Sequence, residues 1–201
     1  KDEHALAEEH FKKALQYDPT LLDSRLNLGA LYIEQGRWAD AIEQNNLLLD
    51  DPTFLFPERA LVNMGWAEYQ SGNIKAAEQH LREAVRANSR SFQAQLNLGI
   101  VLYEQEEYFD AAIHLEQVLR ILADRQPGLF TPKEAEARFR LGVSYIKLGQ
   151  REKALEHLRV ASERGGAGEW GKRSKGDQTG LCRIEHFAAN GVESLLQAAF
   201  L

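Results

Sequence analysis

Histidine is the residue whose spacing most suggests chemistry in this 201-residue sequence. Four histidines occupy equivalent places of a repeated pattern: His10, His80, His114 and His157. A periodic set of imidazoles could bind a metal ion or act as a pH switch. Equivalent residues in stacked helices lie about 10 Å apart, however, whereas a metal–nitrogen bond is about 2 Å long. We therefore expect no metal site, and interpret these residues as semi-exposed histidines retained by repeat descent.

The glycine-rich segment 166–171 has the spacing of a dinucleotide-binding loop. That pattern binds a pyrophosphate only where it follows a strand and begins a helix, whereas here it follows a predicted helix. Residues 166–172 also fit most of a phosphate-binding loop, but Arg173 stands where Ser or Thr would bind magnesium. We therefore expect no nucleotide and no other cofactor.

The residue pattern gives no sign of nucleophilic or metal-assisted catalysis. The sequence contains neither an HExxH motif nor a GxSxG elbow. Its one cysteine, Cys182, lies among apolar residues, which favours a buried thiol over a reactive one. A single cysteine also excludes an intrachain disulfide and a multi-cysteine zinc site. We expect a protein without catalytic residues.

The composition limits the classes of partner. Apolar residues make up 44% and charged residues 27%, which is ordinary for a globular protein. The longest apolar run falls well short of the roughly 18 residues that a membrane-spanning helix needs. The formal net charge of -6 disfavours nucleic acid, since neutralising phosphates requires a basic face. A protein partner remains the expectation.

A repeat organises most of the chain. Four Leu-Gly or Met-Gly pairs recur at intervals of 36, 34 and 43 residues: Leu28-Gly29, Met64-Gly65, Leu98-Gly99 and Leu141-Gly142. With each glycine at place eight of a 34-residue frame, place twenty is always alanine: Ala41, Ala77, Ala111 and Ala154. Place fifteen is glycine three times and glutamate once: Gly36, Gly72, Glu106 and Gly149. The N-terminus supplies the second half of a further unit.

This pattern, over residues 3–168, resembles the tetratricopeptide repeat, a helix–turn–helix unit of 34 residues. The resemblance implies an all-α fold, a right-handed superhelix of stacked helix pairs. Small residues at places eight and twenty would let the two helices of a unit approach closely. Glycine at place fifteen permits the positive φ of a tight turn between them. All five prolines fall in or beside the predicted connections between units.

The frame predicts helices at residues 3–17, 22–35, 38–50, 58–71, 74–88, 92–105, 108–124, 134–148 and 151–164. The array covers residues 1–168, with one partial unit followed by units at about 22–55, 58–91, 92–125 and 135–168. A glycine-rich linker is expected at 169–180 and a C-terminal capping helix at 181–201. Helix 3–17 lacks the first helix of its unit, so its apolar face is expected to lie open unless upstream residues or a partner cover it.

In this family the first helix of each unit lines a concave face that binds peptides. The residues expected there are Asn27, Asn63, Asn97 and Arg140 at place six, Trp66 and Ile100 at place nine, and Tyr69 and Tyr103 at place twelve. Asparagine amides suit an extended peptide backbone, and aromatic side chains supply anchoring area. The asparagines could equally be inherited features of the repeat. Acidic residues on these helices oppose the binding of a chaperone's carboxylate tail: Asp23, Glu34, Glu104 and Glu136.

Two connections between units are longer than the repeat requires, by two residues near Pro52–Pro57 and by nine near Gln126–Pro132. Both join a second helix to the next first helix, so we expect them on one edge of the array. Each carries apolar side chains: Phe54, Phe56, Leu129 and Phe130. Apolar side chains gathered at an edge favour a partner contact. The alternative is that they fold under their own loops.

The segments Phe56–Arg59 and Leu102–Tyr108 are similar to stretches of the type IV pilus pilotins, the PilF/PilW and Tgl group. That resemblance implies a lipoprotein on the periplasmic face of the outer membrane, which helps the secretin pore to localise and assemble. Separately, we expect a monomer. Because the chain starts at Lys1 and has one methionine, Met64, we interpret it as a trimmed product. Any membrane contact is expected only through a lipid anchor upstream. The alternative is a general cytosolic tetratricopeptide adaptor or co-chaperone in the cytoplasm.

Overall fold

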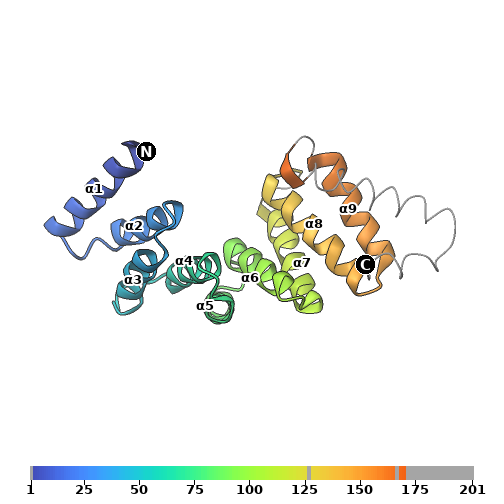
Figure 1. Ribbon diagram of the computed structural model, residues 1–201, viewed down its shortest axis with the longest axis horizontal. Coiled ribbons are helices and arrows are strands. Elements are labelled where there is room, and N and C mark those ends of the chain that lie inside the picture. Colours follow the sequence, from blue (N-terminus) through green and yellow to red (C-terminus); the bar gives the residue numbers. More distant parts are fainter. Residues whose placement is uncertain (1, 126–127, 166–167, 171–201) are drawn as a thin grey trace. The chain divides into compact units, whose positions relative to one another are not determined.

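The computed structural model describes residues 2–125, 128–165 and 168–170, and the regular elements within them are all helices (Figure 1). Their bounds are α1 Asp2–Tyr17, α2 Leu22–Glu34, α3 Trp38–Leu49, α4 Pro57–Gln70, α5 Ile74–Ala87, α6 Phe92–Glu104, α7 Tyr108–Arg125, α8 Pro132–Lys147 and α9 Arg151–Gly165. Each helix that the repeat frame predicts between residues 3 and 164 is present, and no end differs from its predicted position by more than two residues. The predicted all-α fold is confirmed.

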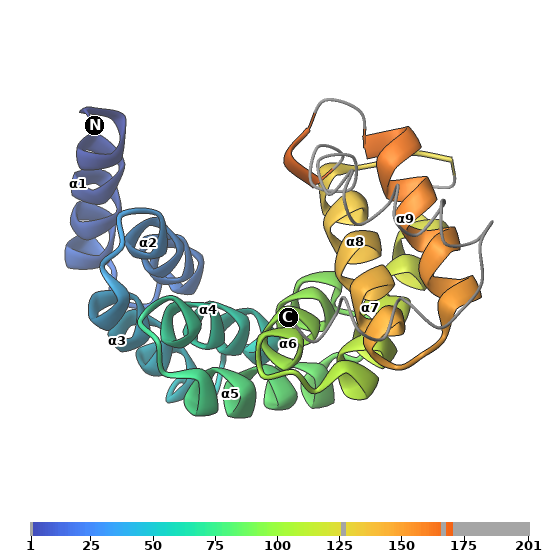
Figure 2. The ribbon, with the colours of Figure 1, turned by 45° about the vertical axis from the view of Figure 1, so that its right-hand side comes forward.

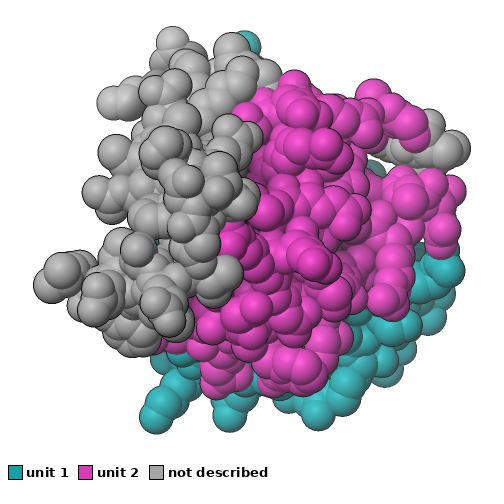
Figure 3. All heavy atoms as spheres, turned by 90° about the vertical axis from the view of Figure 1, so that its right-hand side faces the viewer, with its two compact units in different colours: residues 1–105 teal, residues 106–201 magenta. Residues whose placement is uncertain are grey.

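The chain divides into two compact units, which are described separately. Unit 1 comprises residues 1–105, with α1 to α6, and unit 2 comprises residues 106–201, with α7 to α9. Figure 3 shows unit 2 in magenta and unit 1 in teal. In unit 1, α2 packs against α3 and α4 against α5; in unit 2, α8 packs against both α7 and α9.

Local sequence signals explain where several helices begin. Thr131 caps α8, because its hydroxyl accepts a hydrogen bond of 3.1 Å from the backbone N–H of Glu134. Pro132 follows at the first helical position, where its missing N–H has no consequence. Ser91 caps α6 in the same way, through the N–H of Ala94. These two caps explain why α6 begins at Phe92 and α8 at Pro132.

The turn between the two helices of a repeat depends on place fifteen. The backbone φ there is 74° at Gly36, 88° at Gly72 and 71° at Gly149. The next residue then donates across the helix end, as Arg37 N–H does to Tyr32 C=O over 2.8 Å, which is a Schellman motif. Glu106 adopts the same left-handed conformation, with φ of 62°, although it carries a Cβ atom. The predicted requirement for positive φ is therefore confirmed even where glycine is absent.

Close packing between paired helices depends on the glycine at place eight. A Cβ atom added to Gly65 would lie 2.6 Å from Cγ of Leu81, and one added to Gly142 would lie 2.6 Å from Cγ of Leu158. Non-bonded carbons prefer about 3.5–4.0 Å, so no larger residue fits without displacement. The prediction that small residues at place eight allow the two helices to approach closely is confirmed at Gly65 and Gly142.

The N-terminal helix α1 lacks a covering helix on one side within the described residues. Its residues at places twenty, twenty-four and twenty-seven are only half-buried: Ala7, Phe11 and Ala14. The equivalent residues of α5 are fully buried: Ala77, Leu81 and Ala84. Ala7 and Phe11, together with Leu15, pack against a core cluster that includes Leu28, Leu31 and Tyr32 of α2.

Gly168, Glu169 and Trp170 are described beyond α9, and Trp170 packs on α8. Glu169 and Trp170 have helical backbone conformation. The Trp170 ring lies 5.5 Å from the Phe139 ring and 4.5 Å from the guanidinium of Arg140. These two residues belong to the segment predicted as a linker; the rest of that linker and the predicted capping helix lie outside the described residues. Within the described part of the chain, no helix is long and apolar enough to cross a membrane.

Candidate protein-binding surface

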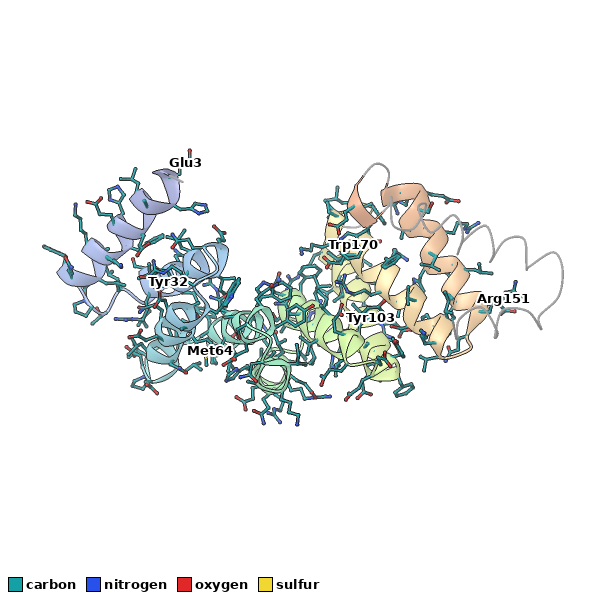
Figure 4. The ribbon with its side chains drawn as sticks, viewed as in Figure 1. Glu3, Tyr32, Met64, Tyr103, Arg151 and Trp170 are labelled. Atoms are coloured by element: carbon teal, nitrogen blue, oxygen red, sulfur yellow. The ribbon has the colours of Figure 1, made fainter. Side chains whose placement is uncertain are left out.

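The first helices of the repeats in unit 1 stand side by side, since α4 contacts both α2 and α6. Figure 2 shows this row above α3 and α5. The residues at places six, nine and twelve follow helical spacing, so they share one face of each helix. We call this face of unit 1 the helix-A surface: Asn27, Asn63, Trp66, Tyr69, Asn97, Ile100 and Tyr103. Figure 4 labels Tyr103 on α6.

The aromatic residues of the helix-A surface retain accessible area. Trp66 and Tyr69 on α4 are half-buried, and their ring centroids lie 5.1 Å apart with planes inclined by 33°. Tyr103 on the neighbouring helix α6 is also half-buried. Large rings held by their neighbours lose little conformational freedom when a partner covers them. The three sequence-predicted aromatic residues are thus partly exposed on two neighbouring helices.

The three asparagines of the predicted ladder differ in their surroundings. Asn27 is exposed. Asn63 is half-buried, and its Nδ2 donates to Oδ1 of Asn45 over 3.2 Å. Asn97 is only 3% exposed, and its Oδ1 accepts from Nε2 of Gln93 over 3.1 Å. Of these amides, that of Asn27 offers the most accessible surface for a bound backbone.

Two other predicted contact residues are packed inside the protein. Ile100 is 1% exposed and contributes to the interior. Arg140, in unit 2, is buried with its guanidinium bonded to Glu136 over 2.8 Å and covered by the Trp170 ring. A partner would therefore reach little of either side chain.

Asn45 was not among the predicted site residues. Place twenty-four is leucine in the other complete repeats, but Asn45 is fully buried there and its Nδ2 donates to the Ala41 carbonyl over 2.7 Å. Its exceptional identity at an otherwise apolar place was the available signal. Because its Oδ1 receives the bond from Asn63, Asn45 determines how one predicted contact residue is oriented.

The two long connections lie in different units. In unit 1, Phe56 is 53% exposed and Leu55 78% exposed. Phe54 instead packs against the buried cluster of Leu26, Leu48 and Ala60. Phe56 is therefore accessible to a partner, as the first expectation requires, whereas Phe54 folds under its own connection, as the alternative requires.

In unit 2, Leu129 is 56% exposed, whereas Phe130 is half-buried. The guanidinium of Arg164 lies 4.9 Å from the Phe130 ring and donates to the Gly128 carbonyl over 3.1 Å. The α9 helix thus holds this connection in place.

The histidines adopt individual environments. His10 is exposed, whereas His157 stacks on Tyr145 with ring centroids 5.7 Å apart. Burial and the nearby charge of Arg138 lower the pKa of His157, because both disfavour the imidazolium. The described residues contain no group of three side chains that could hold a metal ion.

Comparison with known families covers most of the chain. Tetratricopeptide repeat models match residues 2–52, 59–95 and 90–164. Among curated proteins, the chain is 30% identical over 111 residues to the type IV pilus assembly protein PilF of Pseudomonas aeruginosa. That match covers 54% of this chain and 43% of the relative. The matched region thus spans less than half the length of the curated relative.

Several solved structures share the fold. The Pseudomonas aeruginosa PilF structure has a TM-score of 0.69 at 20% identity and covers 86% of this chain and 74% of its own. PilW, described as a widely conserved type IV pilus biogenesis factor, has a TM-score of 0.67 at 20% identity, with coverages of 81% and 71%. MamA has a TM-score of 0.63 at 26% identity, with coverages of 79% and 86%. With its helix pairs, its glycine-dependent turns and these matches, the chain belongs to the tetratricopeptide repeat family.

Proposed function

We propose that this chain is a non-catalytic protein-binding scaffold that acts in type IV pilus biogenesis. The observation that carries the proposal is the 30% identity to PilF over 111 residues. The likeness of the fold to PilF and PilW is compatible with it. In the finer form of the proposal the protein is a pilotin-like lipoprotein at the periplasmic face of the outer membrane, and its partner is a secretin subunit.

The helix-A surface of unit 1 is the proposed contact. Trp66, Tyr69 and Tyr103 offer apolar area for alternate side chains of a bound segment, and the Asn27 amide can bond to its backbone. Aromatic residues that become fully covered commonly contribute more to binding than single hydrogen bonds do. Phe56 and Leu129 are further candidates for contact, each in its own unit.

Binding assays can test the surface directly. We expect Trp66→Ala to weaken binding to the periplasmic part of the secretin at least as much as Asn63→Ala and Asn97→Ala combined. The control is Leu47→Ala, which removes an exposed apolar side chain from α3 in the same unit and should leave affinity unchanged. If Trp66→Ala and the double asparagine variant both bind like the wild type, the helix-A surface is not the contact.

The pilotin role has a separate test in the organism that encodes the chain. Deleting the gene should abolish secretin multimers while secretin monomer is still made, and the wild-type gene should restore them. A precursor whose first 25 residues or so end in a lipid-modified cysteine would support the anchor. Normal multimers in the deletion strain would refute the role.

The alternative is a general tetratricopeptide adaptor in the cytoplasm. The likeness to MamA at 26% identity and the shared fold with YrrB, described as having an unusual peptide-binding site, fit this alternative equally well. A precursor with a plain cytosolic start, together with unaffected secretin multimers, would support this adaptor. The binding assay on the helix-A surface applies to both functions.

A further inference from the structure

The helix-A surface of unit 1 has acidic residues where its helices end. Glu34 is the last residue of α2 and Glu104 the last residue of α6. Both occupy place thirteen, directly after Ile33 and Tyr103 at place twelve, and both are exposed. Glu34 retains 65% of its side-chain exposure. The apolar part of the surface is therefore bordered by two carboxylates from different repeats.

Helix electrostatics adds to this negative border. The carboxyl end of a helix carries partial negative charge from its unpaired carbonyls. Basic residues usually offset that charge, but α2, α4 and α6 have none in their last turns. Glu34 and Glu104 thus add formal charge at positions that already disfavour it. Local helix stability gives no reason for glutamate at either place.

The two carboxylates are also poorly compensated by side chains. Glu104 forms no ion pair within the part of the chain that the structure describes, and Glu34 has only His4, with Nε2 at 3.7 Å, which is a cation only when protonated. Elsewhere in unit 1 an acidic residue has permanent cations, as Glu8 has Lys12 and Arg37. The guanidinium of Arg59 on α4 is directed to a different carboxylate, that of Asp23, at 3.8 Å.

We propose that the helix-A surface binds a cationic amphipathic peptide segment, in which lysine or arginine alternates with apolar residues. This rests on the proposed function, because it takes the same surface as the contact. The carboxylates of Glu34 and Glu104 would receive the cationic groups, and the faces of Trp66 and Tyr69 attract cations as well as apolar groups. An acidic segment would meet uncompensated negative charge, so charge selects between partners with the same apolar residues.

Two synthetic peptides, each titrated with the intact chain, can test whether the helix-A surface prefers a cationic segment. They are fluorescein-labelled peptides of about 12 residues with identical leucine and phenylalanine positions, one with lysine and the other with glutamate at the remaining positions. We expect the lysine peptide to bind at least about tenfold more tightly by fluorescence anisotropy. Its affinity should fall as sodium chloride rises from about 50 to about 300 mM, because exposed charge pairs are screened.

Charge-reversal variants test whether Glu34 and Glu104 cause the preference for the lysine peptide. Glu34→Lys with Glu104→Lys should weaken the lysine peptide about tenfold and improve binding of the glutamate peptide. The matched control is Glu43→Lys with Glu83→Lys, which changes net charge equally on α3 and α5 and should have little effect. Circular dichroism should show that both double variants remain folded, since the Glu34 and Glu104 changes relieve repulsion at helix ends.

The outcomes separate this inference from the proposed function. Equal binding of both peptides, or equal losses in the test and control variants, would overturn the cationic preference. If Trp66→Ala still weakened binding in that case, the helix-A surface would stand as a contact without charge selection. If Trp66→Ala also had no effect on either peptide or on the secretin fragment, the contact itself would be refuted.

Discussion

Asn63 on α4 donates a hydrogen bond of 3.2 Å to Asn45, which is fully buried on α3 of the preceding repeat. Asn45 uses its own Nδ2 on the Ala41 carbonyl, so Asn63 supplies the partner for its oxygen. The bond therefore joins two repeats through a polar pair at a place that is apolar elsewhere. It also gives Asn63 a structural role that is independent of any partner.

Replacing Asn45 should raise stability. Leucine occupies this place opposite glycine in two other repeats, at Leu81 and Leu158. Asn45→Leu should therefore fit against Gly29 and increase the free energy of unfolding by about 1 kcal/mol, since it removes a buried polar group. Asn63→Ala should instead decrease it by about 1 kcal/mol, because Asn45 loses a partner. Urea unfolding of both variants measures this, and a less stable Asn45→Leu variant would show that the polar pair is needed.

Enlarging Gly65 should destabilise unit 1. The new Cβ atom of Gly65→Ala would approach Cγ of Leu81 to 2.6 Å, so the helix pair must separate. We expect a loss of about 1–3 kcal/mol in the free energy of unfolding, as in other overpacked cores. Adding Leu81→Ala should cost less in this background than in the wild type, because it relieves the clash. Strictly additive losses would argue against direct contact between the two places.

The turn at place fifteen offers a reciprocal test of backbone strain. Glu106 has φ of 62°, so Glu106→Gly should stabilise the protein by about 0.5–1 kcal/mol. Gly72 has φ of 88°, and a Cβ atom there would meet no other atom within 4 Å, so Gly72→Ala adds strain without a clash. It should destabilise by a similar amount. Thermal unfolding of the two variants should give shifts of opposite sign, and shifts of the same sign would exclude strain as the common cause.

The two phenylalanines of the first long connection should respond differently to substitution. Phe54 packs on the cluster of Leu26, Leu48 and Ala60, so Phe54→Ser should lower the free energy of unfolding by about 2 kcal/mol. Phe56 is 53% exposed, so Phe56→Ser should change it by less than about 0.5 kcal/mol. Denaturant titration distinguishes them. Equal losses would mean that both rings are structural.

The ion pairs of Glu8 predict a dependence of stability on pH. Hydrogen bonds from Lys12 and then Arg37 lower the pKa of Glu8 to about 2, whereas an unfolded glutamate has a pKa of about 4.3. A lowered folded-state pKa stabilises the protein fully above about pH 4.5, and this contribution is lost as pH falls toward 2. Glu8→Gln should therefore cost about 1 kcal/mol at pH 7 and progressively less toward pH 3.

Urea unfolding at several pH values checks this dependence. Glu9→Gln is a suitable control, because Glu9 pairs with Lys13 on the exposed side of the same helix and lacks an arginine partner. Its effect should be smaller at every pH. A Glu8→Gln effect that does not change between pH 7 and pH 3 would exclude the carboxylate charge as its source.

Local residue patterns were sufficient to predict the helices and turns. Pro132 and Gly36 act on the backbone within a few residues, through a fixed φ and a permitted positive φ. Helix ends were therefore predictable to within two residues. The close approach of the helices at Gly65 was also predictable, because small residues recur at places eight and twenty of the repeat.

The features of the helix-A surface could be predicted only in part. The frame correctly grouped Trp66 and Tyr69 on one helix face, where their rings contact each other. It could not distinguish the three asparagines at place six, since they share both residue type and place. Their exposure differs because their neighbours differ, with Asn45 beside Asn63 and Gln93 beside Asn97.

The sequence by itself thus determined the repeat, its helices, its turns and the glycine contacts, because each depends on interactions within one 34-residue unit. Only the tertiary structure decided that Arg140 is covered by Trp170 and that Phe54 is packed while Phe56 is exposed. Those properties depend on which side chains from separate helices meet, and burial and ion pairing follow from that proximity rather than from residue type.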